Sequence, residues 1–350
     1  MLTKKEVKEV REHLGKAQNP VFFFDNDQDG LCSFLLLRRY IGRGRGVPIK
    51  SFPDLDKDYF GKVEEFKADY IFILDKPLVS EEFFREAEKF NVPVVWIDHH
   101  LIDKELVPSF VNYYNPLFNR TKKEEPVTAL CYQIADVKED IWLAVVGCIS
   151  DKFVPPFYGE FEKKYPDLIV DSKESLDIFY KSQIGRIARI IGFALKDRTT
   201  DVMNMIRFLS KVNNPYEVLE ENNKNHTMHR RFSQIDSKYQ KFLKKAISLG
   251  DDYEKLVFFQ YGGDLSISSD IANRLSYIFP KKIIVVIYIK GIKANISMRG
   301  KKCRDVLLKA IEGIEDARGG GHEDAVGGQI RVDDIEKFRE NIEYILNSSY

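Results

Sequence analysis

Three aspartates spaced two residues apart lie near the N-terminus, in the run Asp25-Asn26-Asp27-Gln28-Asp29-Gly30. Carboxylates that alternate in this way can direct their oxygens into one small volume, where their negative charges repel one another. A multivalent cation is the natural counter-ion for such a group. The run therefore predicts a metal site.

Two other interpretations of this run explain less of it. Its opening matches an EF-hand calcium loop, but that loop needs a bidentate glutamate at its twelfth position. Counted from Asp25, the twelfth position is Leu36, and the preceding residues 21–24 are typical of a strand rather than a helix. A turn that caps the next helix accounts for one aspartate and not for three.

Residues of the same chemistry end three further apolar runs. Asp75 follows residues 70–74, Asp98-His99-His100 follows residues 92–97, and Asp151 follows residues 141–150. In an open parallel sheet ligands bind outside the carboxyl ends of the strands, so we expect these side chains to converge. Oxygen and imidazole ligands without thiolate suit Mn²⁺ or Mg²⁺ better than a structural zinc. Six or more ligands would serve two ions, which is the arrangement used in phosphoryl transfer.

The elements that must position these residues alternate between strand and helix. Residues 5–16, 31–40 and 80–90 are expected to be helices between the apolar runs. Residues 172–248 are helical and polar in pattern, and a second block with strands at 256–259, 282–289 and 294–298 follows. The prediction is an α/β protein with a parallel-sheet domain (1–171), a helical connector (172–248) and a smaller α/β domain (249–350).

Composition limits the function classes. Lys plus Arg and Asp plus Glu both number 54, which excludes a generally basic nucleic-acid coat but not a local basic groove. The four cysteines are scattered without a CxxC pair, which argues against a disulfide framework and a structural zinc site. No run approaches the ~18 apolar residues of a membrane helix, and the N-terminus lacks a signal-peptide core. We therefore expect a cytoplasmic protein without a membrane partner.

Taken together, the aspartate run, Asp75, Asp98-His99-His100 and Asp151 resemble the four motifs of the DHH phosphoesterase superfamily. Aspartate at the first motif position is most similar to the archaeal-type RecJ-like single-strand exonucleases. The run Gly319-Gly320-Gly321-His322 resembles the signature of the accompanying DHHA1 domain. The resemblance spans most of the chain, and five motifs in the right order make it specific.

The resemblance implies two Mn²⁺ ions, with Mg²⁺ as the alternative. Asp25 and Asp27 would hold the first ion and Asp75 would bridge the two. The second ion would be held by Asp75 together with Asp29, His99 and Asp151. This assignment predicts hydrolysis of a phosphodiester by two-metal activation of water.

The resemblance also implies roles for residues that hold no metal. Asp98 would orient a neighbouring ligand or histidine, and His100 would face the scissile phosphate. In the second domain, a Ser-x-Arg segment and the glycine-rich loop would grip the nucleotide. The matching residues are Ser297, Arg299, Gly320, Gly321 and His322. The substrate is expected in a cleft between the two domains.

Three functions remain open from the sequence. We favour a Mn²⁺-dependent exonuclease on single-stranded DNA or RNA. About twenty residues follow Gly328, too few for an appended OB-fold, so we expect a helicase or a replication or repair protein as partner. The alternative is a small-substrate phosphodiesterase for nano-RNA, cyclic dinucleotides or 3′-phosphoadenosine 5′-phosphate. A replication scaffold without metals is disfavoured because every predicted ligand is present.

Two basic features also have open interpretations. Lys76, directly after Asp75, departs from the small residue common in relatives; it could ion-pair with that aspartate, contact phosphate or point to solvent. A cluster of arginines, Arg38, Arg39, Arg43 and Arg45, could follow a nucleic-acid backbone or end a solvated helix.

Overall fold

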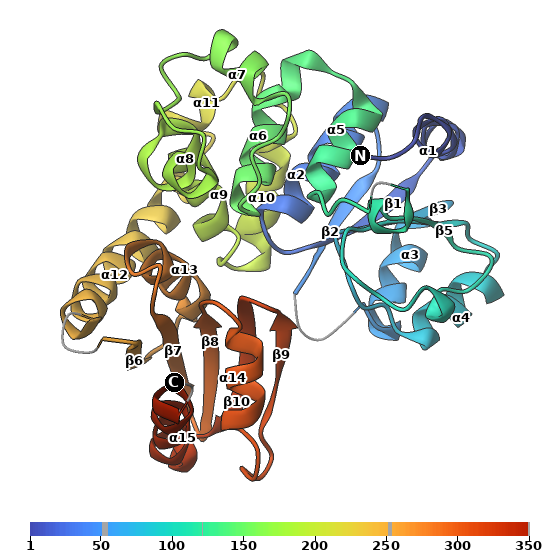
Figure 1. Ribbon diagram of the computed structural model, residues 1–350. Coiled ribbons are helices and arrows are strands. Elements are labelled where there is room, and N and C mark those ends of the chain that lie inside the picture. The colour runs from blue at the N-terminus through green and yellow to red at the C-terminus, as the bar shows by residue number, and fades with distance from the viewer. Residues whose placement is uncertain (51–54, 121, 251–253, 349–350) are drawn as a thin grey trace. The chain divides into compact units, whose positions relative to one another are not determined.

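The computed structural model describes residues 1–50, 55–120, 122–250 and 254–348. It divides into two compact units, Met1–Phe232 and Ser233–Tyr350, each described below by itself (Figure 1). The boundary lies inside helix α12 (His226–Gly250), within the segment expected to be a connector. The earlier helices of that segment pack into the hydrophobic core of the first unit, with Ile178, Ile190 and Leu209 fully buried.

The first unit is built on one parallel sheet of five strands in the order β2-β1-β3-β4-β5. The strands are β1 (Pro20–Asp25), β2 (Arg45–Ile49), β3 (Tyr70–Leu74), β4 (Val94–Ile97) and β5 (Asn112–Tyr114). The three apolar runs predicted as β1, β3 and β4 are confirmed. The edge strands β2 and β5 were not predicted, because β2 contains glycine and proline and β5 has three residues.

Side chains alternate across this sheet and bury both of its faces. Phe22 and Phe24 of β1 belong to one core, whereas Phe23 between them belongs to the other. A strand that is covered on both faces has no polar side, so it appears in sequence as one continuous apolar run. Helices α3 and α4 contribute to the second core, and most of the remaining helices contribute to the first.

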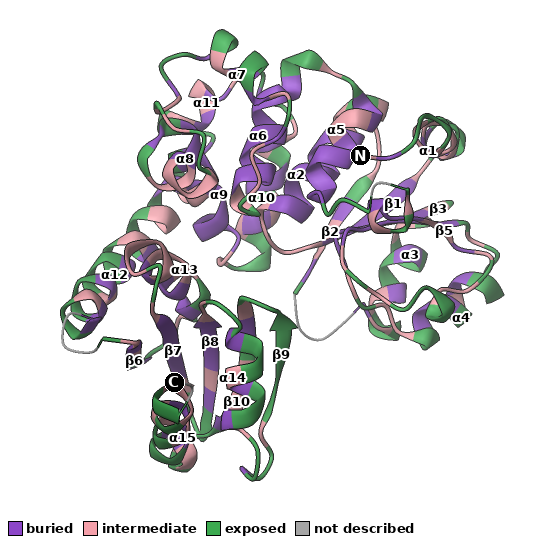
Figure 2. Cartoon of the chain, in the orientation of Figure 1, coloured by how far each residue is buried: buried purple, intermediate pink, exposed green. Residues whose placement is uncertain are grey.

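The helices of the first unit agree with the predicted ones at 5–16, 31–40 and 80–90. Their bounds are α1 (Lys4–Lys16), α2 (Gln28–Ile41), α3 (Phe60–Phe66), α4 (Glu81–Lys89), α5 (Val127–Ala135), α6 (Ile141–Ser150), α7 (Tyr158–Lys164), α8 (Ser175–Lys181), α9 (Gln183–Ala194), α10 (Thr199–Leu209) and α11 (Tyr216–Leu219). Helix α6 is the most thoroughly buried of them (Figure 2). Among the described residues, no helix combines the length and apolarity needed to span a bilayer.

One element differs in type from the sequence prediction. The apolar run at 141–150 was expected to be a strand that ends at Asp151, but it forms helix α6. Every residue from Ile141 to Ile149 is buried, because α6 packs against α2, α5 and α9. A helix buried all round has no polar stripe, so periodicity cannot distinguish it from a buried strand.

The second unit is a mixed five-stranded sheet in the order β6-β7-β8-β10-β9. Only β6 and β7 are parallel, and the other neighbours are antiparallel. The elements are β6 (Leu256–Gly262), α13 (Ser268–Ile278), β7 (Ile283–Lys290), β8 (Lys293–Arg299), α14 (Cys303–Ala310), β9 (Arg318–His322), β10 (Ala325–Arg331) and α15 (Ile335–Ser348). The three strands predicted in this block are confirmed.

The glycine run was wrongly expected to be a loop. Residues 318–322 form the edge strand β9, which pairs antiparallel with β10. Strand β10 itself carries Gly327 and Gly328, so glycine faces glycine along the pair. The backbone hydrogen bonds of the ladder order a sequence that has almost no side chains to pack.

Candidate metal centre

The order of the strands places the aspartates at one point of the first sheet. The chain runs from β1 to the edge at β2 and then returns to β3 on the other side of β1. The carboxyl ends of β1 and β3 therefore flank the crevice where an open α/β sheet binds its ligand. Asp25 ends β1 and Asp75 follows β3, while Asp98-His99-His100 follows the neighbouring strand β4.

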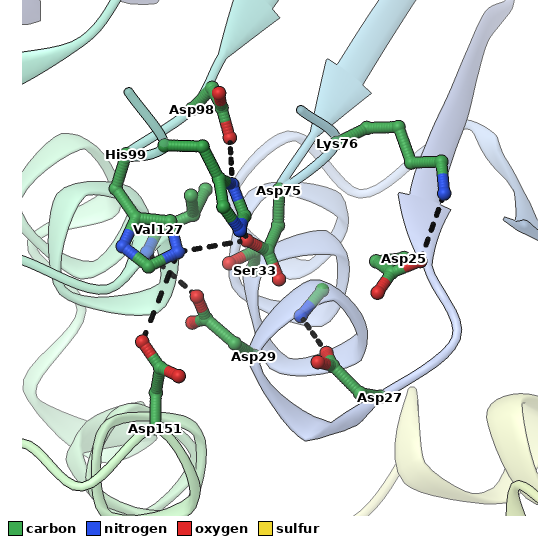
Figure 3. A network of polar contacts seen from close by, with 12 residues as sticks. Asp25, Asp27, Asp29, Ser33, Asp75, Lys76, Asp98, His99, Val127 and Asp151 are labelled. Atoms are coloured by element: carbon green, nitrogen blue, oxygen red, sulfur yellow. Dashed lines mark hydrogen bonds and ion pairs between the residues drawn. The ribbon is translucent and has the colours of Figure 1, made fainter. Parts of the chain in front are cut away.

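Histidine 99 is at the centre of the cluster. Its Nε2 lies 3.3 Å from Asp75 Oδ1 and 3.9 Å from Asp151 Oδ2 (Figure 3). Asp75, His99 and His100 each offer one ligand atom within 4.8 Å of the others, and so do Asp29, His99 and Asp151. We call these five residues the His99 group. Asp151 reaches it from the C-terminal end of helix α6 and not from a strand end.

Asp98, which follows β4, and Asp75, which follows β3, are both buried. Asp98 is fully buried, and its Oδ1 lies 2.8 Å from His100 Nδ1, which holds the orientation of that ring. Burial lowers the pKa of His100, but the hydrogen bond and the charges of Asp98 and Asp75 outweigh it and raise the pKa above its usual value. Burial also lowers the pKa of His99, but the negative charges of Asp29 and Asp151 outweigh it, so the pKa is raised.

Asp29 is held between two helices. It lies in the first turn of α2 and is 3% exposed. Its Oδ2 accepts from the backbone N–H of Val127 at 2.9 Å, and its Oδ1 accepts from that of Thr128 at 2.7 Å. A carboxylate at the N-terminus of a helix such as α5 is favourably placed against the helix dipole. Each carboxylate oxygen keeps a second lone pair, so these bonds leave Asp29 able to ligate a cation.

Asp27 is the N-cap of α2, and its Oδ1 accepts from the N–H of Gly30 at 2.9 Å. Burial, followed by the charges of Asp25 and Asp29, raises its pKa to about 8. Burial, followed by the charges of Asp29 and Asp27, also raises the pKa of Asp75 well above its usual range. The centre therefore carries more negative charge than its own side chains can balance.

The His99 group fits a divalent cation. Asp75 Oδ1 and His99 Nδ1 are buried atoms that make no hydrogen bond, although buried polar atoms usually do. The backbone of Asp75 is held in the left-handed region at φ 57°, a strained conformation that tends to occur at functional sites. Carboxylate oxygens together with imidazole nitrogens are ligands for Mn²⁺ or Mg²⁺.

Asp25 does not join this group. Its Oδ1 lies 3.3 Å from the Nζ of Lys76, which is 2% exposed and also donates to the backbone oxygen of Lys50 at 3.0 Å. Lys76 therefore does not point to solvent, and its ion pair is with Asp25 rather than with the adjacent Asp75. Asp25 was expected to face a metal ion, but in the structure the positive charge beside it is the ammonium group of Lys76.

The predicted substrate-binding residues lie in the second unit, on three neighbouring strands. Gly327 of β10 is opposite both Ser297 of β8 and Gly320 of β9. Arg299 and His322, two residues further along their strands, are likewise opposite one shared residue of β10. Opposed residues of antiparallel strands share a face of the sheet, and so do residues two apart. Ser297, Arg299, Gly320 and His322 therefore share one face.

The details of this face differ from the expectation at one position. A Cβ added to Gly320 would meet nothing within 4 Å, so the backbone there is open to a ligand. Gly321 belongs to the opposite face, where an added Cβ would lie 2.7 Å from the oxygen of Ala325. Its φ of 134° also requires glycine, so its role in this strand pair is conformational.

The arginine cluster is committed to structure instead of forming an open groove. Arg39 pairs with the buried Asp140, with Nη2 2.6 Å from Oδ1. Arg43 donates to the backbone oxygen of Ala17 at 2.7 Å, just after α1 ends. Arg45 stacks over Phe66 with 4.7 Å to the ring centroid.

Sequence reasoning missed several residues that position the centre. The amides of Val127 and Thr128 hold Asp29, and Glu124 Oε1 lies 4.0 Å from His99 Nδ1. They come from the charged stretch and helix between residues 122 and 135, to which we assigned no element. The indole of Trp96 donates to the backbone oxygen of Lys76 at 3.0 Å. The sequence places Trp96 inside a predicted strand, which indicates that the side chain is buried but not that it makes this hydrogen bond.

A family model and solved structures both resemble this chain. Residues 252–348 match the model of the DHHA1 domain. No curated protein matches the sequence. The resemblance found in the second unit is thus confirmed for that domain.

Solved structures resemble the whole described chain in fold. One is the exonuclease RecJ bound to manganese, at 16% identity and a TM-score of 0.70, covering 100% of this chain and 96% of that one. Another is RecJ in complex with Mn²⁺ from Thermus thermophilus, at 17% identity and a TM-score of 0.71. This chain is covered over 99% there but spans only 55% of that protein.

A third similar structure is the pGpG-specific phosphodiesterase PggH from Vibrio cholerae. It has 14% identity and a TM-score of 0.51, and the match covers 95% of this chain and 100% of that one. Identities this low establish the fold and leave the activity to the chemistry of the site. Residues 252–348 match the DHHA1 domain, and the chain as a whole has the α/β fold of RecJ and its structural relatives.

Proposed function

We propose that this protein is a metal-dependent phosphodiesterase, and specifically an exonuclease on single-stranded DNA or RNA. The observation that carries the proposal is the His99 group, whose residues come from four separate segments. They form two sets of three that share His99, and within each set the ligand atoms lie within 4.8 Å of one another. Asp29, Asp75, His99 and Asp151 would hold Mn²⁺ or Mg²⁺, which would supply positive charge against the phosphoryl oxygens and lower the pKa of a water for in-line attack.

The remaining chemistry belongs to the chain. Asp98 holds the His100 ring through Nδ1, so that the other side of the ring is presented to a phosphodiester. The raised pKa of His100 favours its protonated form, which donates a hydrogen bond to a developing negative charge. Asp75 and Asp151 flank His99, and we assign them together with Asp29 to holding the cation.

Binding of the rest of the substrate is assigned to the second unit. Arg299 Nε donates to the side chain of Asn273 at 2.6 Å, which orients the guanidinium. Gly320, on the same face of the sheet, has backbone that is open to a ligand. An arginine that shares a face with open glycine backbone is suited to a phosphate. Ser297, whose Oγ lies 2.9 Å from that of Ser268, and His322 complete this face.

The test uses metal-stripped protein, to which Mn²⁺ or Mg²⁺ is returned. The substrates are a long single-stranded DNA, the matching RNA, each labelled in turn at either end, and a dinucleotide. We expect a metal-dependent ladder on the long strands that disappears with Asp75→Asn. The exposed Asp58→Asn is the matched control and should cleave as the wild type does.

Each outcome of this test has a definite meaning. Cleavage of the dinucleotide alone would favour the small-substrate phosphodiesterase, for which the fold shared with PggH is the supporting observation. Loss of cleavage in the Asp58 control would show that any aspartate change damages the protein. No metal-dependent cleavage of any substrate would refute the proposal. The expected helicase or replication partner remains a prediction, which a pull-down from cell extract can test.

A further inference from the structure

Lys76 is an unusual residue for a cation-binding centre. Among the described residues it is the one lysine or arginine classed with the buried side chains, and it is 2% exposed. A buried positive charge is costly unless a carboxylate and further hydrogen bonds compensate it. Here the compensation comes from Asp25 Oδ1 at 3.3 Å and the oxygen of Lys50 at 3.0 Å.

The surrounding structure directs this side chain away from the His99 group. The indole of Trp96, which is 3% exposed, donates to the backbone oxygen of Lys76 and holds the chain after β3. Lys76 directly follows Asp75, whose backbone is in the left-handed region. Figure 3 shows Asp75 pointing toward His99, whereas Lys76 reaches to Asp25 at the end of β1.

The potential metal ligands divide accordingly. The two clusters of ligand atoms share His99 and draw on Asp29, Asp75, His100 and Asp151, and within the described chain neither includes Asp25 or Asp27. Asp25 is instead paired with an ammonium group. A dication bound to the same carboxylate would stand close to that ammonium, in a partly buried place where like charges repel strongly.

We propose that Lys76 supplies the positive charge beside Asp25 that one of two cations would otherwise supply, so that the centre binds one divalent cation, at the His99 group. This proposal rests on the metal dependence in the proposed function. It departs from the two-ion arrangement that the sequence resemblance implies. Lys76 is thereby a determinant of metal stoichiometry rather than a ligand.

The experiment counts ions and does not depend on turnover. Metal-stripped full-length protein is titrated with Mn²⁺ alone, and bound Mn²⁺ is measured by calorimetry and by the electron paramagnetic resonance signal of the free ion. We expect one ion per chain for the wild type. Lys76→Met removes the charge but keeps most of the side-chain volume, and we expect it to bind two.

Two matched variants test the charge argument. Lys76→Arg keeps the positive charge and should bind one ion. The double variant Asp25→Asn/Lys76→Met removes both partners of the pair together, so it should also bind one. Exposed Lys89, 66% accessible, provides Lys89→Met as a control for the substitution itself, and one ion is expected there.

Lys76→Met removes the positive charge beside the partly buried Asp25, so folding is checked by circular dichroism. If that variant does not fold, Asp25→Asn alone decides the question. One ion in Asp25→Asn shows that Asp25 does not hold the cation, and loss of the ion overturns the proposal. A folded Lys76→Met protein with one ion also overturns it.

The outcomes separate this inference from the proposed function. Two ions in the wild type, bound with similar affinity, refute the role of Lys76 and leave metal-dependent phosphodiester hydrolysis intact. No bound ion in the wild type refutes both. One ion together with an absence of cleavage on every substrate refutes the proposed function alone.

Discussion

Gly30, the residue that ends the aspartate run, packs too closely against β1 to accept even one added methyl group. Gly30→Ala adds one methyl group in the first turn of α2, immediately after Asp29. That Cβ would lie 2.4 Å from the oxygen of Asp25 and 2.8 Å from its nitrogen. Both atoms belong to the backbone of β1, so no side-chain rotation can relieve the overlap.

The size of the effect follows from these distances. An ordinary van der Waals contact begins at 3.4 Å, so the shortest contact is 1.0 Å too close and α2 must move away from β1 by a similar amount. Overpacking of this kind costs about 1–3 kcal/mol of the free energy of unfolding. Asp29 moves with α2, and a misplacement of about 1 Å in a catalytic centre can lower the rate about 100-fold.

Urea unfolding and Mn²⁺-dependent cleavage measure the two effects separately. Gly61→Ala is the matched control, because Gly61 is also in the first turn of a helix, is exposed and has no atom within 4 Å of an added Cβ. We expect the free energy of unfolding of that control to rise by up to about 1 kcal/mol, because alanine loses less entropy than glycine when a helix forms. Wild-type stability and wild-type activity in Gly30→Ala would refute the argument from close packing.

Three further predictions follow from the centre and from the second unit. Asp98→Asn should lower kcat with little change in Mn²⁺ affinity. Because Asp98 acts through the His100 ring, the double variant Asp98→Asn/His100→Ala should have a kcat no lower than that of His100→Ala. Steady-state kinetics of the wild type, the two single variants and the double variant measure this, and additive losses of kcat would contradict it. Metal-free protein should become less stable as pH rises from about 4 to about 8, because over this range Asp27 keeps its proton in the folded state and loses it on unfolding. For each such group the free energy of unfolding falls by at most about 1.4 kcal/mol per pH unit. Urea midpoints in EDTA should therefore fall with pH and should fall less with Mn²⁺ present; a flat or rising profile in EDTA would contradict the raised pKa. Arg299→Ala should raise KM more than it lowers kcat, whereas the exposed Lys301→Ala should change neither, and equal effects of the two would remove Arg299 from the binding face.

Much of the fold could be predicted because its signals are local. Fully buried parallel strands such as β1 appear as continuous apolar runs, and each of the predicted ones is followed by a polar residue. The parallel order then brings distant strand ends together without further information. The two mistaken element types, α6 and β9, occur where local periodicity is absent, since one is apolar on all sides and the other is almost all glycine.

The sequence by itself determined the chemical inventory: carboxylates and imidazoles at the ends of apolar runs, in an order that allows them to converge. Tertiary structure decided how that inventory is divided. Whether Lys76 faced solvent, Asp75 or phosphate depended on the hydrogen bond from Trp96 and on Asp25 at the end of a different strand. Charge pairing acts over a few ångströms in three dimensions, and spacing along the chain does not specify those distances.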